Sequence, residues 1–153
     1  MDGYSLISGL ALLLTGWVVG AESASWRLVQ PVIAGQDEPS QVRFEQGLLR
    51  TYGRVMPVVM PLTGISLLVA GLLAPADSTA ARVLWLSAAG CSLMVVVTTL
   101  AVNVPINTRT AQYDAATPPP GWRAERERWS VFQGVRVGLL GAAFVLAVVA
   151  VVR

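Results

Sequence analysis

The sequence contains no histidine and no lysine, and its single cysteine is Cys91. Without histidine the chain cannot form a Glu-x-x-His di-iron site, a haem site with a histidine ligand or a Ser-His-Asp triad. One cysteine forms no disulfide within a chain, and a small hydrophobic side chain is the favoured interpretation of Cys91. No Gly-x-Gly-x-x-Gly or P-loop motif occurs either. We therefore expect no metal site and no bound cofactor.

Charged residues are also scarce, at 13% of the chain, whereas soluble domains contain about 25%. Hydrophobic residues make up 54%, and the mean hydropathy is +0.61. Four apolar segments cover about residues 5–25, 55–73, 83–104 and 132–152. Each is near the roughly 17–25 residues that cross a hydrocarbon core. The sequence predicts an all-α integral membrane protein, an up-down four-helix bundle that forms a single transmembrane domain over residues 1–153.

Three polar stretches connect these segments, at about residues 22–54, 74–81 and 107–128. In the first, Pro39-Ser40 is typical of a helix start and predicts a short extra helix, Gln41–Arg54, that leads into the second span. In the last, the alternating charges of Glu125–Arg128 indicate a solvated helix start.

Arginines set the expected orientation, because cytoplasmic loops are enriched in basic residues. The first and third connections contain Arg27, Arg43, Arg50, Arg54, Arg109, Arg123, Arg126 and Arg128, and the other side holds Arg82 and Arg153. We predict that both arginine-rich connections are cytoplasmic and both termini outside, in the plasma membrane if the source is bacterial.

Two ionisable residues lie at the edges of apolar segments, Glu22 at the end of the first and Arg136 near the start of the last. Such residues are costly in a bilayer and usually face the bundle interior in pairs. Glu22 is either an interfacial carboxylate or a buried acid–base group. Arg136 either extends to the surface, pairs with Glu22 or binds an anionic oxygen. We favour an inward-facing Arg136.

Asparagines flank a proline in Asn103-Val104-Pro105-Ile106-Asn107. Their amides either bind a substrate oxygen or cap a helix that Pro105 breaks. Trp129, Gln133 and Arg136 share a helical face three to four residues apart.

Three further residues are candidates for a site near Glu22. Trp26 lies one helical turn after Glu22, Tyr52 is a second candidate proton carrier, and Met56 is an adaptable wall residue for an apolar ligand. Gly16-xxx-Gly20 and Gly134-xxx-Gly138 are close-approach motifs that serve either packing within the chain or formation of a homo-oligomer.

The Asn-x-Pro-x-Asn string, followed by a polar loop, Arg128-Trp129 and Arg136 in a glycine-rich last segment, resembles the anthrone-oxygenase-like family of small four-helix membrane proteins. The resemblance extends over nearly the whole chain. It implies oxidation of anthrones to anthraquinones, or related tailoring of polyketides, with Asn103, Asn107, Trp129 and Arg136 lining the site. Family members often carry an asparagine between that Trp and Arg, where this chain has Gln133.

The leading hypothesis is a membrane-embedded biosynthetic tailoring enzyme for an apolar aromatic or polyketide-like substrate, with a cofactor-independent anthrone-type oxygenase as the specific candidate. Glu22 would transfer a proton, while Arg136, Asn103 and Asn107 would stabilise an oxyanion. Trp26 and Trp129 would stack on the rings.

Two other functions remain open: an acid–base cyclase or isomerase that uses Glu22, and a non-catalytic membrane carrier or assembly subunit. Membrane lipid is an expected partner. Nucleic acid is not, since no basic stripe alternates with aromatic residues.

Overall fold

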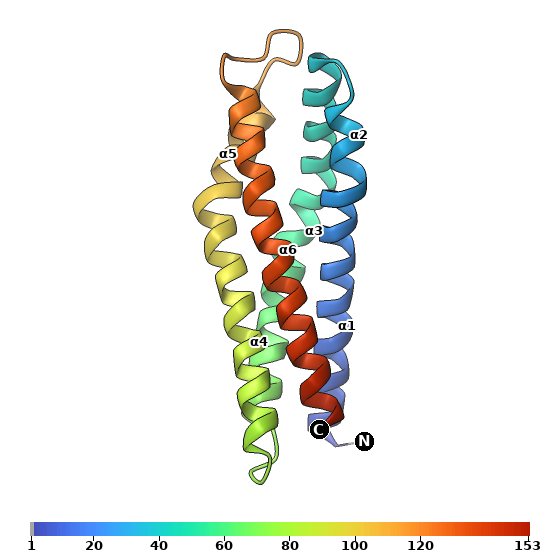
Figure 1. The fold of residues 1–153 in the computed structure, drawn as a ribbon, viewed down its shortest axis with the longest axis vertical. Helices are drawn as coiled ribbons and strands as arrows, with labels where there is room; N and C mark the ends of the chain where they lie inside the picture. The colour runs from blue at the N-terminus through green and yellow to red at the C-terminus, as the bar shows by residue number, and fades with distance from the viewer. Residues whose placement is uncertain (1) are drawn as a thin grey trace.

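The computed structural model describes residues 2–153, which form four long helical columns with short connections. The columns cover Gly3–Ala34, Glu38–Leu73, Thr79–Gln112 and Trp122–Val152, and each is long and apolar enough to cross a membrane. They alternate in direction, so both termini and the residue 74–78 connection lie at one end (Figure 1). The other two connections lie at the opposite end. The predicted all-α, up-down four-helix bundle is confirmed.

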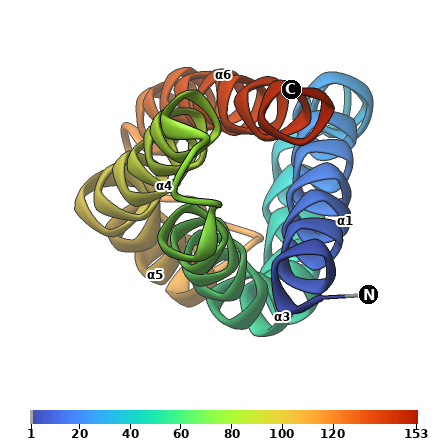
Figure 2. The same cartoon turned by 90° about the horizontal axis from the view of Figure 1, so that it is seen from below.

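Viewed along its axis, the bundle is a ring in which each column packs against the next in the sequence and the last packs against the first (Figure 2). Two columns contain a π-helical turn, named η1 and η2. The elements are α1 (Gly3–Ala24), η1 (Ser25–Val29), α2 (Gln30–Ala34), α3 (Glu38–Leu73), α4 (Thr79–Thr98), η2 (Thr99–Asn103), α5 (Val104–Gln112) and α6 (Trp122–Val152).

Buried residues recur every three or four positions along each column, as expected for helices that share one seam. The half of the bundle nearest the termini has an apolar core of small side chains packed around Trp85 and Leu67. A layer of Val18, Met60, Val95 and Leu140 follows. Beyond that layer, towards the arginine-rich end, the same seams carry buried polar residues beside a third apolar cluster of Val102, Ile106 and Trp129.

The connections at the arginine-rich end are much shorter than the sequence suggested, and the arginines themselves lie in the flanking helices. The first is only Gly35–Asp37, and the predicted helix Gln41–Arg54 is a continuous part of α3. The prediction placed a loop there because hydropathy marks the limit of the hydrocarbon, which is not the end of the helix. At 36 residues, α3 is about 54 Å long, whereas the hydrocarbon core is about 30 Å thick. The polar half of α3 therefore extends beyond the hydrocarbon.

Asp37 begins this long helix as its N-cap. Its Oδ2 accepts a hydrogen bond from the Ser40 backbone N–H at 3.3 Å, and the interaction with Ser40 lowers the pKa of Asp37 below its usual range. Pro39 follows in the first turn of the helix. Backbone N–H groups in a first turn have no partner within the helix, so the missing N–H of proline costs no hydrogen bond there.

Each π-helical turn comes shortly before a proline, Pro31 after η1 and Pro105 after η2. The sequence left open a helix broken at Pro105, but η2 instead accommodates the missing N–H and the column continues to Gln112. A π turn holds one extra residue, and here it brings two neighbouring residues, Val102 and Asn103, into the buried seam. The seam passes through Val95 of α4 before the turn and continues at Ile106 of α5 after it.

One glycine of each predicted close-approach motif is packed within the chain. An ideal Cβ on Gly16 would lie 3.1 Å from the Phe144 ring, and one on Gly134 would lie 2.6 Å from the Trp26 indole. Gly20 and Gly138 meet open space.

Candidate functional site

A cavity of about 470 Å³ occupies the half of the bundle nearest the arginine-rich connections. α3 and the η2–α5 segment form its sides, and α1 and α6 supply its polar wall. Most of its lining is apolar, from Leu48, Leu49, Met56, Pro57, Met60, Pro61, Val96, Leu100 and Val104. Such a cavity suits an apolar ligand that is oriented by a few polar groups.

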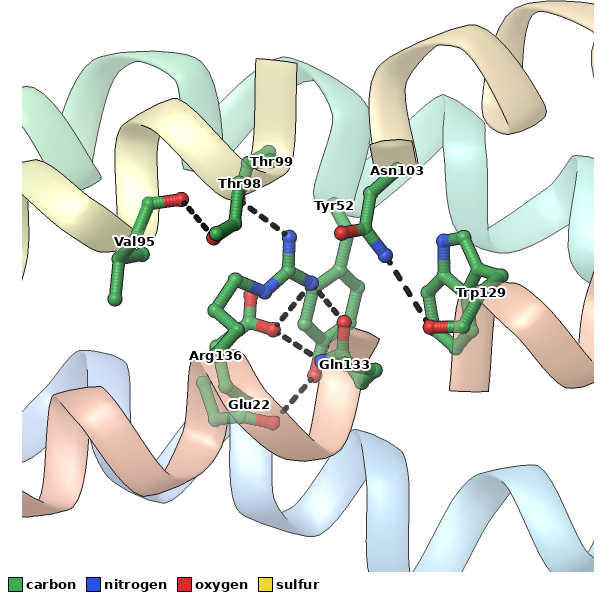
Figure 3. Close-up of polar contacts among 10 residues, drawn as sticks. Glu22, Tyr52, Val95, Thr98, Thr99, Asn103, Trp129, Gln133 and Arg136 are labelled. Atoms are coloured by element: carbon green, nitrogen blue, oxygen red, sulfur yellow. Dashed lines mark hydrogen bonds and ion pairs between the residues drawn. The ribbon is translucent and has the colours of Figure 1, made fainter. Parts of the chain in front are cut away.

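Glu22, Gln133 and Arg136 form a buried polar cluster in the cavity wall (Figure 3). The Arg136 Nη2 lies 2.7 Å from the Glu22 Oε2. Gln133 Nε2 donates to the same Oε2 at 2.5 Å, and its Oε1 accepts a hydrogen bond from Arg136. Arg136 also donates to Thr99 Oγ1 at 3.3 Å. The pairing of Glu22 with Arg136, one of the alternatives left open by the sequence, is therefore present.

Several polar atoms around this cluster have no partner among residues 2–153. Trp129 Nε1, Arg136 Nε and Asn107 Oδ1 are buried without a hydrogen bond. The contacts of Glu22 with Gln133 and Arg136 are all made by Oε2, which leaves Oε1 free for a ligand. Because a buried polar atom without a partner costs free energy, these donors and acceptors fit a ligand that carries oxygen.

Prolines in α3 add backbone acceptors to the cavity wall. Pro57 and Pro61 lack the N–H that would normally bond the carbonyls of Gly53 and Pro57, four residues earlier. Gly53, Pro57 and Pro61 all line the cavity. The carbonyls of Gly53 and Pro57 therefore lack their usual helical donors.

Most of the predicted site residues line this one cavity: Glu22, Tyr52, Met56, Asn107, Trp129, Gln133 and Arg136. The Tyr52 hydroxyl donates to the carbonyl of Ala21 at 3.3 Å, which places it beside Glu22 along the chain. Met56 belongs to the apolar wall, as the sequence suggested.

Two predicted residues lie elsewhere. Asn103 is fully buried between η2 and α6, where its Nδ2 donates to the carbonyl of Trp129 at 3.3 Å, and it does not line the cavity. Trp26 packs on Gly134 and donates to Ser130 Oγ at 3.3 Å, so its ring is held against α6. Trp26 does not line this cavity and lies instead in a neighbouring hollow with Gln30, Glu45 and Arg126.

A second buried ion pair was missed. Arg126 Nη2 lies 2.7 Å from Glu45 Oε2, Gln30 donates to the same oxygen at 3.4 Å, and the guanidinium lies 4.2 Å from the Trp129 ring centroid. Glu45 and Gln30 line the cavity.

The interpretation of Glu125–Arg128 as a solvated stretch is wrong for Arg126. The sequence contained a signal for the burial of Arg126. It lies three residues before Trp129 and so continues the helical face of Arg136, Gln133 and Trp129. Within residues 2–153, no group of three or more acidic, cysteine or histidine side chains is placed to hold a metal ion.

Comparison with known protein families matches residues 49–146 to the family described as anthrone oxygenase. The match covers well over half of the chain and includes α3 from Leu49, α4, η2, α5 and most of α6. No curated protein matches the chain, and no solved structure does.

Proposed function

Since the chain belongs to the anthrone oxygenase family, we propose that it is a membrane-embedded oxygenase that tailors an apolar aromatic, polyketide-like substrate. The observation that carries this proposal is the buried ion pair of Glu22 and Arg136 in the wall of a largely apolar cavity. This arrangement suits a flat substrate that enters as a neutral molecule and becomes an anion during the reaction.

In the first step, Glu22 Oε1 removes a proton from the CH₂ group opposite the ring carbonyl of an anthrone-type substrate. The negative charge spreads over the ring system to the carbonyl oxygen. Arg136 Nε and Trp129 Nε1 are the buried donors without a partner that are available to hydrogen-bond that oxygen. Hydrogen bonds preorganised in a site of low dielectric constant stabilise such an anion strongly.

In the second step, the electron-rich carbon reduces dioxygen, and a carbon–oxygen bond forms to give a peroxide. Glu22 returns its proton to the outer oxygen. Removal of the second C–H proton then breaks the O–O bond, and the hydroxide that leaves takes up this proton to form water. Overall the substrate loses two hydrogens and gains one oxygen, while the other oxygen leaves as water, so dioxygen is the only oxidant required.

The arginine-rich end of the bundle is proposed to be cytoplasmic, in agreement with the usual excess of basic residues on that side. The cavity then lies in the cytoplasmic half of the membrane, where an apolar substrate arrives from the bilayer or from a cytoplasmic enzyme.

The test uses the purified protein in detergent with anthrone under air. Oxygen uptake and product mass are followed for the wild type, Glu22→Gln and Arg136→Gln. Glu38→Gln is the matched control, because Glu38 forms an exposed ion pair with Arg123 at 2.7 Å. We expect Glu22→Gln to lower kcat by about 10²–10⁴-fold, the usual contribution of a general base, and the control to keep its activity.

Three outcomes would change the proposal. A product of unchanged mass would indicate a cyclase or isomerase that uses the same Glu22. Full activity in Glu22→Gln would remove Glu22 from the mechanism. Binding without turnover would favour a carrier of apolar aromatic molecules.

A further inference from the structure

A second hollow lies on the outer face of the bundle, in the seam between α3 and α4. It has a volume of about 360 Å³ and an almost entirely apolar lining. Small residues, Gly64, Ala89, Gly90 and Ser92, contribute to its lining. The longer side chains that line it, Ile65, Leu68, Leu86 and Leu93, are exposed and so face lipid. We call this hollow the α3–α4 groove.

The groove adjoins the cavity. Pro61 of α3 and Val96 of α4 line both hollows, so they mark the place where one meets the other. Farther along, the two helices touch, since a Cβ on Gly64 would lie 3.0 Å from Ser92 Oγ. The groove is therefore closed towards the bundle core and open towards the bilayer.

We propose that the α3–α4 groove binds an aliphatic chain of the substrate whose ring system occupies the cavity. This inference rests on the proposed function and narrows its substrate class. The substrate is an amphipathic phenol or anthrone that carries an alkyl tail. The groove extends along α4 from Val96 to Leu86, about 15 Å, which accommodates an extended chain of roughly a dozen carbons.

The junction of the groove with the cavity favours a tail of the substrate over the acyl chain of a lipid. A tail joined to a ring in the cavity is held at the junction of Pro61 and Val96. A lipid chain has no such anchor and exchanges freely with bulk lipid.

Photo-crosslinking tests the location of the tail without requiring turnover. The probe is a 4-alkylphenol whose chain, roughly a dozen carbons long, ends in a diazirine. Full-length protein in detergent is irradiated with the probe, and labelled residues are mapped by mass spectrometry. We expect labelling at residues 64–68 of α3 and 86–93 of α4. Anthrone competes with the probe for the cavity. At ten times its Kd, anthrone should lower this labelling about tenfold.

Gly90→Leu blocks the groove in the second arm. A Cβ on Gly90 meets open space, so the larger side chain fills the groove without displacing a helix. Gly138→Leu on α6 is the matched control, because Gly138 also meets open space. Labelling of the groove should be lost in Gly90→Leu and retained in Gly138→Leu.

The outcomes separate this inference from the proposed function. Labelling that anthrone lowers but that maps to other helices, or that persists in Gly90→Leu, would overturn the groove and leave the cavity intact. Labelling that anthrone does not lower would also overturn the groove, because the phenol ring would not be in the cavity, and the oxygen-uptake test would still decide the proposed function. If Gly90→Leu does not fold, the residues labelled in the wild type decide by themselves whether the tail lies in the groove.

Discussion

Glu22→Gln should destabilise the protein strongly, although glutamine has nearly the shape of glutamate. The change leaves Arg136 as a buried cation without its carboxylate, since the two side chains are 9% and 2% exposed. Removing one partner of a buried ion pair costs about 3–5 kcal/mol. Arg136 keeps its contacts with Gln133 and Thr99, which favours the lower end of this range.

Thermal unfolding in detergent measures the effect. For a chain of this size, 1 kcal/mol corresponds to a change in Tm of about 2–4 °C, so Glu22→Gln should lower Tm by roughly 6–20 °C. The exposed pair of Glu38 and Arg123 contributes at most about 1 kcal/mol. Glu38→Gln should therefore change Tm by only a few degrees.

A double variant, Glu22→Gln with Arg136→Met, separates stability from catalysis. It removes both charges, so it should recover at least half of the Tm lost by Glu22→Gln while remaining without oxygenase activity. If Glu22→Gln and Glu38→Gln had the same Tm, the reasoning would be refuted, because Glu22 and Arg136 would then be solvated.

Three further changes test other parts of the structure. Glu45→Gln should destabilise by about 3–5 kcal/mol, because it leaves Arg126 buried without a carboxylate. Gly134→Val should cost about 1–3 kcal/mol, since its Cβ would overlap the Trp26 indole. Asp37→Asn should remove a pH dependence of the protein's stability. Because folding lowers the pKa of Asp37, its carboxylate stabilises the folded state at pH values above its ordinary pKa of 3.8. This contribution is lost as the pH falls through the lower pKa of the folded state. Tm measured for each variant, and against pH for Asp37→Asn, checks all three.

Each of these changes has its own control. The decrease in Tm caused by Glu45→Gln should be smaller when Arg126→Met is added. Gly138→Val should be tolerated, because a Cβ there meets open space. For Asp37, the Tm difference between wild type and Asp37→Asn should shrink below pH 3.8, and a difference independent of pH would contradict the role of the carboxylate.

The sequence was sufficient for the architecture and for one wall of the site. Hydropathy and segment length identified four spans, and the spacing of Trp129, Gln133 and Arg136 put them on one face. Alternation of the spans placed Glu22 at the same end of the bundle as Arg136. These conclusions depend on periodicity and topology, which are local properties of the chain.

Other features depend on how the columns are rotated against one another, which no single segment specifies. Asn103 and Asn107 are four residues apart, a spacing that predicts a common face. In the structure Asn103 contacts α6 and Asn107 lines the cavity. The pairing of Glu45 with Arg126 likewise joins α3 to α6, and hydropathy assigned both residues to polar connections.

The π-helical turn η2 makes this segment tolerant of a change in length by one residue. A π-helical turn holds one residue more than an α-helical turn, so deleting one residue from Thr99–Asn103 would turn the segment into regular α-helix and leave the orientation of α5 nearly unchanged. Asn107 would then stay in the cavity wall. When related chains are aligned, a gap of one residue between Thr99 and Asn103 is therefore compatible with the same site, provided that Pro-x-Asn follows the gap.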